Sequence, residues 1–117
     1  MTEKGVKGRI GEEKALRWLL DQGYALVERN FRAPGGEVDL IVESGPLLVF
    51  VEVKYRLRSY PGAGLEAVTV KKQRSILAAA GQYLVKTNQF SRPLRFDVAE
   101  VTDEGVRYIE NAFSGAW

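Results

Sequence analysis

Cysteine and histidine are both absent from this 117-residue chain. Without cysteine there are no disulfides, no thiolate nucleophile and no thiolate zinc ligand. Without histidine there is no Ser-His-Asp or Cys-His catalytic system and no imidazole metal site. Acid–base or metal chemistry must therefore rest on aspartate, glutamate, lysine and tyrosine.

Long apolar runs are absent as well. No stretch approaches the roughly 20 apolar residues that a membrane-spanning helix requires, and the first residues are polar and basic. We therefore expect a soluble, cytoplasmic protein with no membrane partner. With 45% hydrophobic and 27% charged residues, the chain has the composition of a single globular domain. That domain is expected over residues 1–117, with a core at about 8–111 and a tail at 112–117.

The periodicity of apolar residues, with Gly- and Pro-containing turns between segments, predicts the helices and strands. Helices are expected at about 8–22 and 70–87, with Thr69 as the N-cap of the second. Strands are expected at 24–32, 37–43, 47–55, 94–101 and 106–110. The order α-β-β-β-α-β-β predicts an α/β sandwich in which helices flank a central mixed sheet. Residues 47–51 are apolar on both alternating faces, which is typical of a central strand.

Two carboxylates, Asp39 and Glu52, lie inside segments that otherwise have the pattern of buried strands. A hairpin that pairs Glu43 with Leu48 places Asp39 opposite Glu52, with their Cβ atoms about 5 Å apart. Two like charges at that distance destabilise each other unless a cation lies between them. Carboxylate oxygens are the ligands that Mg²⁺ and Mn²⁺ prefer. We therefore interpret the pair as half of a divalent-metal site.

Lys54 follows Glu52 by two residues, so both side chains leave the same face of the strand. Beside a metal, an ammonium group orients a nucleophile or offsets the charge that develops on a phosphate. The alternative is an ordinary ion pair at a strand end, worth about 0–1 kcal/mol. The aspartate on the adjoining strand favours the metal-site interpretation.

Glu12 stands at i, i+4 and i+7 with Leu16 and Leu19, at the centre of the inward stripe of the first helix. Glu13 lies at the edge of that stripe. An inward carboxylate needs a partner, so we assign Glu12 to the site as a metal or water ligand. The alternative is an acid that complements the dipole in the first turn of a helix, which explains Glu13 better than Glu12.

Basic residues are concentrated between Lys54 and Arg74, where six lysines and arginines stand against one acid, Glu66. The whole chain has a net charge of only +2. A local basic cluster on a nearly neutral protein fits contact with a polyanion. The alternative is a solvated basic helix face beside a charged loop. The cluster consists of Lys54, Arg56, Arg58, Lys71, Lys72 and Arg74.

A wider set of residues resembles the bacterial YraN-like family of uncharacterised proteins, over about residues 8–101. Pro61-Gly62 departs from the pattern, which has an aromatic residue before the glycine. The matching set is Gly11-Glu12, Gly23-Tyr24, Asn30-Phe31-Arg32, Gly36-Glu37-Val38-Asp39-Leu40-Ile41, Phe50-Val51-Glu52-Val53-Lys54, Glu66-Ala67-Val68, Lys72 and Arg95-Phe96-Asp97.

Within that set, Asp39, the Glu52-x-Lys54 triplet and Glu12 resemble the core of the PD-(D/E)XK nuclease superfamily. Val38 stands where that superfamily has proline. The resemblance implies a restriction-endonuclease-like fold. It also implies a metal-dependent, structure-selective endonuclease related to archaeal Holliday-junction resolvases, acting on DNA at a junction or a flap.

The resemblance further implies roles for individual residues. Asp39 and Glu52 would hold Mg²⁺ or Mn²⁺ with help from Glu12 and the Val53 carbonyl, while Lys54 would assist a water molecule. Lys72 would contact the scissile or an adjacent phosphate. A homodimer is expected if two strands are cut symmetrically. The residues that would hold DNA phosphates are Arg56, Arg58, Lys72 and Arg74.

Two other functions compete with the nuclease. A non-catalytic nucleic-acid-binding module on the same scaffold would keep the basic cluster but would be free to lose an acid or the lysine of the site. The intact set favours the nuclease. A small assembly protein that uses Phe113 and Trp117 in its tail would explain none of the buried charge.

Overall fold

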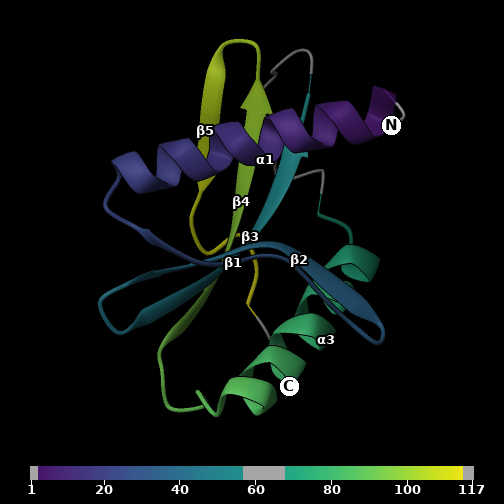
Figure 1. Cartoon of the computed structure of the whole chain (residues 1–117). Helices are drawn as coiled ribbons and strands as arrows, with labels where there is room; N and C mark the ends of the chain where they lie inside the picture. The colour runs from purple at the N-terminus through teal and green to yellow at the C-terminus, as the bar shows by residue number, and fades with distance from the viewer. Residues whose placement is uncertain (1–2, 57–67, 115–117) are drawn as a thin grey trace.

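The computed structural model describes residues 3–56 and 68–114, with side chains from residue 8 onward in the first helix. The order of elements is the predicted one, α-β-β-β-α-β-β (Figure 1). Helix α1 begins at Glu3, earlier than predicted, because a nucleated helix gains one hydrogen bond for each residue added. The elements are α1 (Glu3–Asp21), β1 (Ala25–Ala33), β2 (Gly36–Ser44), β3 (Leu47–Tyr55), α3 (Val70–Thr87), β4 (Leu94–Thr102) and β5 (Gly105–Ile109).

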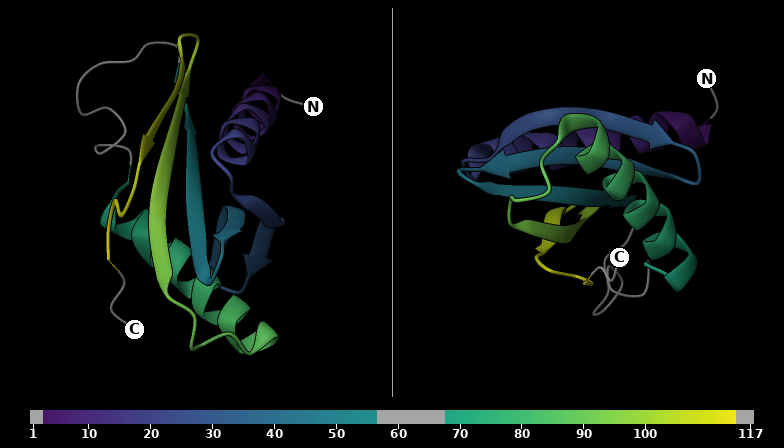
Figure 2. Two further views of the ribbon diagram at one scale, coloured as in Figure 1. Left: turned by 90° about the vertical axis from the view of Figure 1, so that its left-hand side faces the viewer. Right: turned by 90° about the horizontal axis from the view of Figure 1, so that it is seen from below.

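The five strands form one mixed sheet in the order β1-β2-β3-β4-β5. Strands β3 and β4 are parallel, and the other neighbouring strands are antiparallel. Helix α3 makes the connection that a parallel pair requires. The sheet is strongly twisted, and the hairpin of β1 and β2 curves toward α3 (Figure 2). The predicted α/β fold with a mixed sheet between helices is confirmed.

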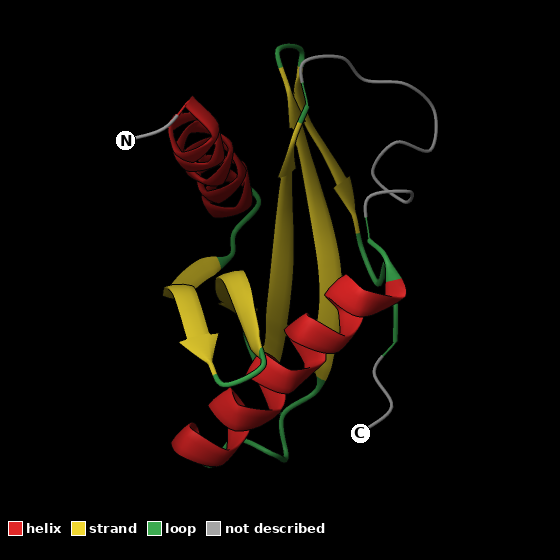
Figure 3. Cartoon of the chain, turned by 90° about the vertical axis from the view of Figure 1, so that its right-hand side faces the viewer, coloured by secondary structure: helices red, strands yellow, loops and turns green. Residues whose placement is uncertain are grey.

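The sheet has a helix on each face, with α1 and α3 on opposite sides (Figure 3). Alternation along β3 separates the two cores, because Leu48 and Phe50 pack with α3 while Val49 and Val51 pack with α1. All four side chains are almost fully buried. Strand β3 is therefore the central, doubly covered strand that its sequence predicts.

Local sequence signals set the ends of α3. The Thr69 hydroxyl accepts a hydrogen bond from the Lys72 amide, which confirms the predicted N-cap. Asn88 ends the helix in the left-handed conformation, with φ of 54°. In the tail, Phe113 is buried and stacks on Phe96, while Trp117 lies outside the described residues. None of the helices in the described ranges is long and apolar enough to cross a membrane.

Gly36 brings the start of β2 into direct contact with α3. A Cβ atom at Gly36 would lie 1.9 Å from the carbonyl oxygen of Ser75, far inside van der Waals contact. The turn before it is held to the same helix, because Gln82 Nε2 donates a hydrogen bond of 2.7 Å to the Pro34 carbonyl. Two adjacent points of the hairpin are thus fixed to α3, and they fix the position of Asp39, three residues along β2.

Candidate metal centre

Asp39 and Glu52 face each other where β2 and β3 separate. Glu43 pairs with Leu48, as predicted, and β2 and β3 keep this register as far as the pair of Leu40 and Val51. Beyond this point a side chain replaces the backbone acceptor, because the Val53 amide donates a hydrogen bond of 2.8 Å to Asp39 Oδ2. This hydrogen bond holds the Asp39 carboxylate at the point where the two strands separate.

Glu52 is only 3% exposed, and its Oε2 atom has no well-formed hydrogen bond within the described residues. Burial raises the pKa of Glu52 to about 8, and the charge of Asp39 and a hydrogen bond to Asp39 act in the same direction. The metal-free chain therefore holds a proton on Glu52 at neutral pH. A buried carboxyl group with an unsatisfied oxygen beside a second carboxyl group fits a divalent-metal site.

This pKa predicts an unusual dependence of stability on pH. Glutamate in the unfolded chain titrates near 4.5, so between there and about pH 8 the folded chain binds a proton that the unfolded chain has lost. Rising pH therefore destabilises the metal-free fold through this window, by roughly 2–4 kcal/mol. Glu52→Gln should remove this contribution, and urea unfolding at pH 5.5 and 8.5 measures it. Glu104→Gln in the exposed β4–β5 turn is the control, and a wild-type stability that rises across the window would contradict the assignment.

Lys72 brings an ammonium group to the carboxylates from the first turn of α3. Its Nζ atom lies 3.5 Å from Glu52 Oε2 and 3.8 Å from Glu37 Oε1. Burial alone would lower the pKa of Lys72, but the charges of Glu52, Asp39 and Glu37 outweigh it and raise the pKa. The resemblance placed Lys72 on a phosphate, whereas here it lies among acids. Sequence reasoning missed Glu37, although its place two residues before Asp39 on one strand was a usable signal.

Helix α1 points Glu12 inward and Glu13 outward, as their spacing predicts. Glu12 is partly buried, and its pKa is raised by burial and by the charge of Asp39, against a hydrogen bond from Asn30 and the charge of Arg29. Glu13 is 61% exposed and forms an ion pair with Arg29. Of the two acids, Glu12 is therefore the one whose carboxyl group interacts with Asp39.

Asn30 is a site residue that sequence reasoning did not single out. Its neighbours Arg29 and Phe31 pair with Leu40 and Val38, which sets Asn30 opposite Asp39 across the hairpin. Its backbone is left-handed, with φ of 51°, and its side chain bonds to Glu12. Asparagine tolerates this conformation and is unfavourable inside a strand, so its presence in β1 was the available signal.

The residues present fit a divalent metal through two carboxylates rather than three. Across residues 3–56 and 68–114, no three acidic side chains come close enough together to hold an ion. Each acid has another partner instead: Asn30 for Glu12, a backbone amide for Asp39, and Lys72 for Glu52. Asp39 and Glu52 are in contact and contribute a buried, unsatisfied oxygen. The metal roles of Glu12 and the Val53 carbonyl stay predictions.

A basic pocket of about 350 Å³ opens beside the carboxylates at the N-terminus of α3. Its described lining contains three lysines and no acid, so it favours an anion. The helix N-terminus adds partial positive charge. Lys71 is exposed and joins the pocket, although it was not among the predicted phosphate contacts. The lining residues are Lys54, Thr69, Lys71, Lys72 and Ser75.

The predicted phosphate contacts divide into three groups. Lys72 lies in the site, as described above. Arg74 is exposed on α3, whereas Arg56 is partly buried and its backbone amide bonds to the Val101 carbonyl. Arg58 lies outside the described residues. The structure therefore brings Lys54 and Lys72 to one pocket, whose described lining includes neither Arg56 nor Arg74.

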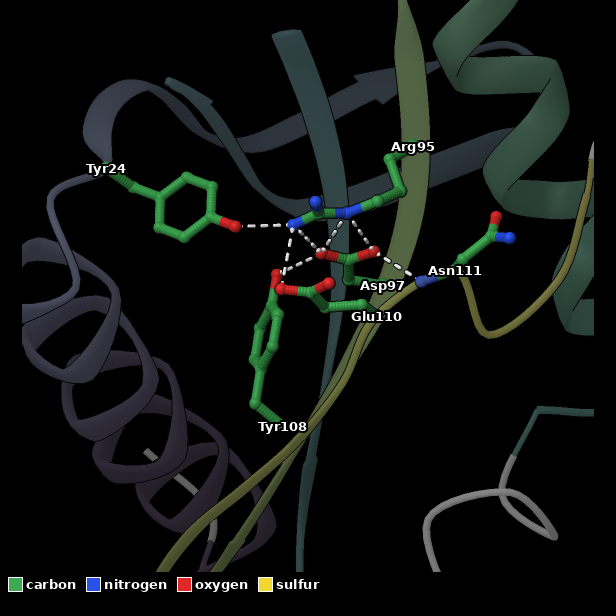
Figure 4. Close-up of polar contacts among 6 residues, drawn as sticks. All are labelled: Tyr24, Arg95, Asp97, Tyr108, Glu110 and Asn111. Atoms are coloured by element: carbon green, nitrogen blue, oxygen red, sulfur yellow. Dashed lines mark hydrogen bonds and ion pairs between the residues drawn. The ribbon is translucent and has the colours of Figure 1, made fainter.

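A second polar cluster, centred on Asp97, lies on the α1 side of the sheet (Figure 4). Asp97 is fully buried and accepts hydrogen bonds from Arg95, from the Tyr108 hydroxyl and from the Asn111 amide. Arg95 also donates to the Tyr24 hydroxyl, and its bonds to Asp97 raise its pKa. Burial, with the charge of Asp97, raises the pKa of Tyr108. These groups satisfy one another, and the cluster ties the chain after α1 to β4 and β5.

Comparison with known sequences decides the family. The model of an uncharacterised protein family, UPF0102, matches residues 11–101. This chain belongs to UPF0102. A UPF0102 protein of Hahella chejuensis is 43% identical over 110 residues, covering 92% of this chain and 89% of its own. One from Lachnoclostridium phytofermentans is 43% identical and covers 94% of each chain. One from Stutzerimonas stutzeri is 40% identical, covering 97% of this chain and 98% of its own.

The UPF0102 match confirms the predicted YraN-like resemblance and nearly the same extent of chain. It spans every described residue of the candidate metal centre, from Glu12 on α1 to Lys72 on α3. Asp97 also lies inside it, whereas Tyr108 and Asn111 lie beyond its end. The family is itself uncharacterised, so any function must be inferred from the geometry of the site.

Proposed function

We propose that this UPF0102 chain is a cytoplasmic, metal-dependent endonuclease that hydrolyses phosphodiester bonds in DNA. The observation that carries the proposal is the buried Glu52 carboxyl, with one unsatisfied oxygen, in contact with Asp39 and beside a lysine-lined pocket. A buried carboxyl group whose pKa is raised by burial and by a neighbouring charge is typical of functional sites. An adjoining anion pocket indicates a phosphate-containing substrate.

Asp39 and Glu52 would hold Mg²⁺ or Mn²⁺, with Glu12 reaching it directly or through water and the Val53 carbonyl as a further ligand. When bound, the metal supplies a polarised phosphate and a water of lowered pKa. The residues of the chain orient the metal ligands and offset charge on the substrate. The Val53 amide and Asn30 orient Asp39 and Glu12. Lys54 leaves β3 on the face of Glu52 and is placed to offset negative charge on the reacting phosphate.

Substrate phosphates would bind along the basic side of the site. The pocket at the start of α3 provides Lys54 and Lys71, and Arg74 extends the positive surface along the helix. Arg56 and Arg58 were assigned the same role from sequence and belong to this proposal. Cutting a four-way junction symmetrically would require two copies of the site, so the proposal includes a homodimer for that substrate.

The decisive experiment separates binding from chemistry. Wild type should cut at least one of a four-way junction, a flap and a single-stranded oligonucleotide when Mg²⁺ or Mn²⁺ is supplied. Lys54→Ala should lower the cleavage rate about 10²–10³-fold while changing the dissociation constant only a few-fold, because its charge acts on the reacting group. Lys14→Ala, an exposed lysine on α1, is the control.

A non-catalytic nucleic-acid-binding module is the second candidate. The observation that favours it is Lys72, whose ammonium already lies within ion-pair distance of Glu52 and Glu37 without a metal. Wild type that binds all three DNAs yet cuts none of them, with either metal present, would establish the module and overturn the nuclease. Molecular mass in solution then tests the dimer, since a strict monomer would exclude symmetrical junction cutting.

A further inference from the structure

The ammonium of Lys72 lies where a cation is needed between the acids of the site. It is within ion-pair distance of two carboxylates on neighbouring strands, Glu52 on β3 and Glu37 on β2. Both distances exceed the roughly 2.7–2.9 Å of a charge-assisted hydrogen bond. The group is therefore attracted by summed negative charge without being bonded closely to either partner.

The side chain of Lys72 also borders a second environment. Besides the carboxylates, it lines the pocket at the start of α3, whose other lysines are Lys54 and Lys71. Its backbone is fixed because the amide is bonded to the Thr69 cap, but the four-carbon stem above it can rotate. Lys72 is 27% exposed, so the ammonium can move into the pocket without a change in the helix.

A divalent metal bound to Glu52 would repel the Lys72 ammonium from its present position. Metal–oxygen bonds to Glu52 are about 2.0–2.1 Å long for Mg²⁺, and Nζ of Lys72 lies 3.5 Å from the same side chain. The two cations would then be close neighbours in a largely buried site, where repulsion is weakly screened. The described lining of the pocket contains no acid that could pair with the displaced ammonium. With the Lys72 ammonium beside Lys54 and Lys71, the pocket would attract a phosphate more strongly.

We propose that Lys72 is an exchangeable cation, which lies against the carboxyl groups of Glu52 and Glu37 in the metal-free protein and is displaced by the metal into the phosphate pocket. Metal loading then prepares the pocket for substrate. The inference rests on the proposed function, because it requires a metal at Asp39 and Glu52. It differs from a fixed structural ion pair, in which Lys72 would support the site in both states.

Metal affinity measured without nucleic acid distinguishes these possibilities. Lys72→Met keeps the length of the side chain and removes its charge, so Mg²⁺ and Mn²⁺ titrated by calorimetry should bind at least about fivefold more tightly than to wild type. Lys14→Met, at an exposed lysine of α1 outside the pocket, should change the affinity less than about twofold. Lys72→Arg keeps the charge and should stay near wild type. Circular dichroism confirms that each variant is folded.

Oligonucleotide binding gives an independent readout. With EDTA present, Lys72→Met should leave the affinity for a single-stranded oligonucleotide nearly unchanged, since the ammonium is held by acids. With Ca²⁺, which takes the same oxygen ligands, the variant should bind the oligonucleotide about fivefold or more weakly than wild type. The effect of the substitution thus depends on metal, which a fixed ion pair does not predict.

The outcomes separate failure of this inference from failure of the nuclease. If wild type binds metal but Lys72→Met binds it equally or more weakly, the exchange is wrong and the metal site stands. An equal loss of oligonucleotide affinity with and without Ca²⁺ would also overturn the exchange. If wild type binds no divalent metal, both the exchange and the proposed function fail.

Discussion

Replacing Asp39 with asparagine should abolish metal-dependent cleavage while leaving the metal-free protein at least as stable as wild type. Asparagine keeps an oxygen that can accept the hydrogen bond from the Val53 amide, so the gap between β2 and β3 stays intact. It removes the charge that helps to raise the pKa of Glu52. We expect a loss of cleavage of about 10³-fold, as for removal of a preorganised electrostatic group.

Two measurements check this expectation. Wild type should gain thermal stability on addition of Mg²⁺, because a ligand that binds only the folded state stabilises it. Asp39→Asn should lose that gain while its melting temperature without metal holds or rises. Asp103→Asn, in the exposed β4–β5 turn, should behave as wild type. If Asp39→Asn instead unfolds the domain and Mg²⁺ never stabilises wild type, Asp39 is structural.

Replacing Asp97 with alanine should produce the largest loss of stability of any single substitution considered. The carboxylate is fully buried and accepts bonds from Arg95, Tyr108 and Asn111, all of which would lose this acceptor. Removing one member of a buried charge pair costs about 3–5 kcal/mol, and the exposed Glu110, 3.7 Å from Arg95, compensates the remaining charge only in part. Urea unfolding measures the loss, with Asp103→Ala as the exposed control.

A double variant tests whether this cost comes from the orphaned charge. Arg95→Met with Asp97→Leu removes both charges and fills the space, so it should be more stable than Asp97→Ala alone. A loss below about 1 kcal/mol in Asp97→Ala would contradict the account, since it would equal that of an ordinary hydrogen bond. Asp97→Ala should affect cleavage only through stability. Asp97 pairs with Val51, whose side chain packs on the α1 face, away from Glu52.

Much of the fold and half of the candidate site followed from periodicity. The hairpin between β2 and β3 fixes its own register, because the short turn between Ser44 and Leu47 sets which residues pair. The opposition of Asp39 and Glu52 therefore needed no tertiary information. The same holds for the inward side of α1, where spacing alone separated Glu12 from Glu13.

Contacts between elements that lie far apart in the sequence could not be predicted from periodicity. Lys72 contacts Glu52 because of where α3 packs along the strands of the sheet. The sequence of α3 alone does not specify that position. The Asp97 cluster depends on the parallel pairing of β3 with β4, formed across a long connection. Charge counted along the chain identified a basic cluster but not its geometry, so Lys71 was missed as a pocket residue and Arg56 proved partly buried.

The contact between Gly36 and the backbone of Ser75 determines the timescale on which the site could accommodate a metal ion. It leaves no space for the β1–β2 hairpin to approach α3 more closely, so Asp39 and Lys72 are carried on a common rigid frame. Accommodating an ion must then proceed by rotation of side chains, which takes picoseconds to nanoseconds, rather than by closure of a lid or domain over microseconds or longer. Metal entry should accordingly be limited by loss of water from the ion, with little backbone rearrangement to slow it.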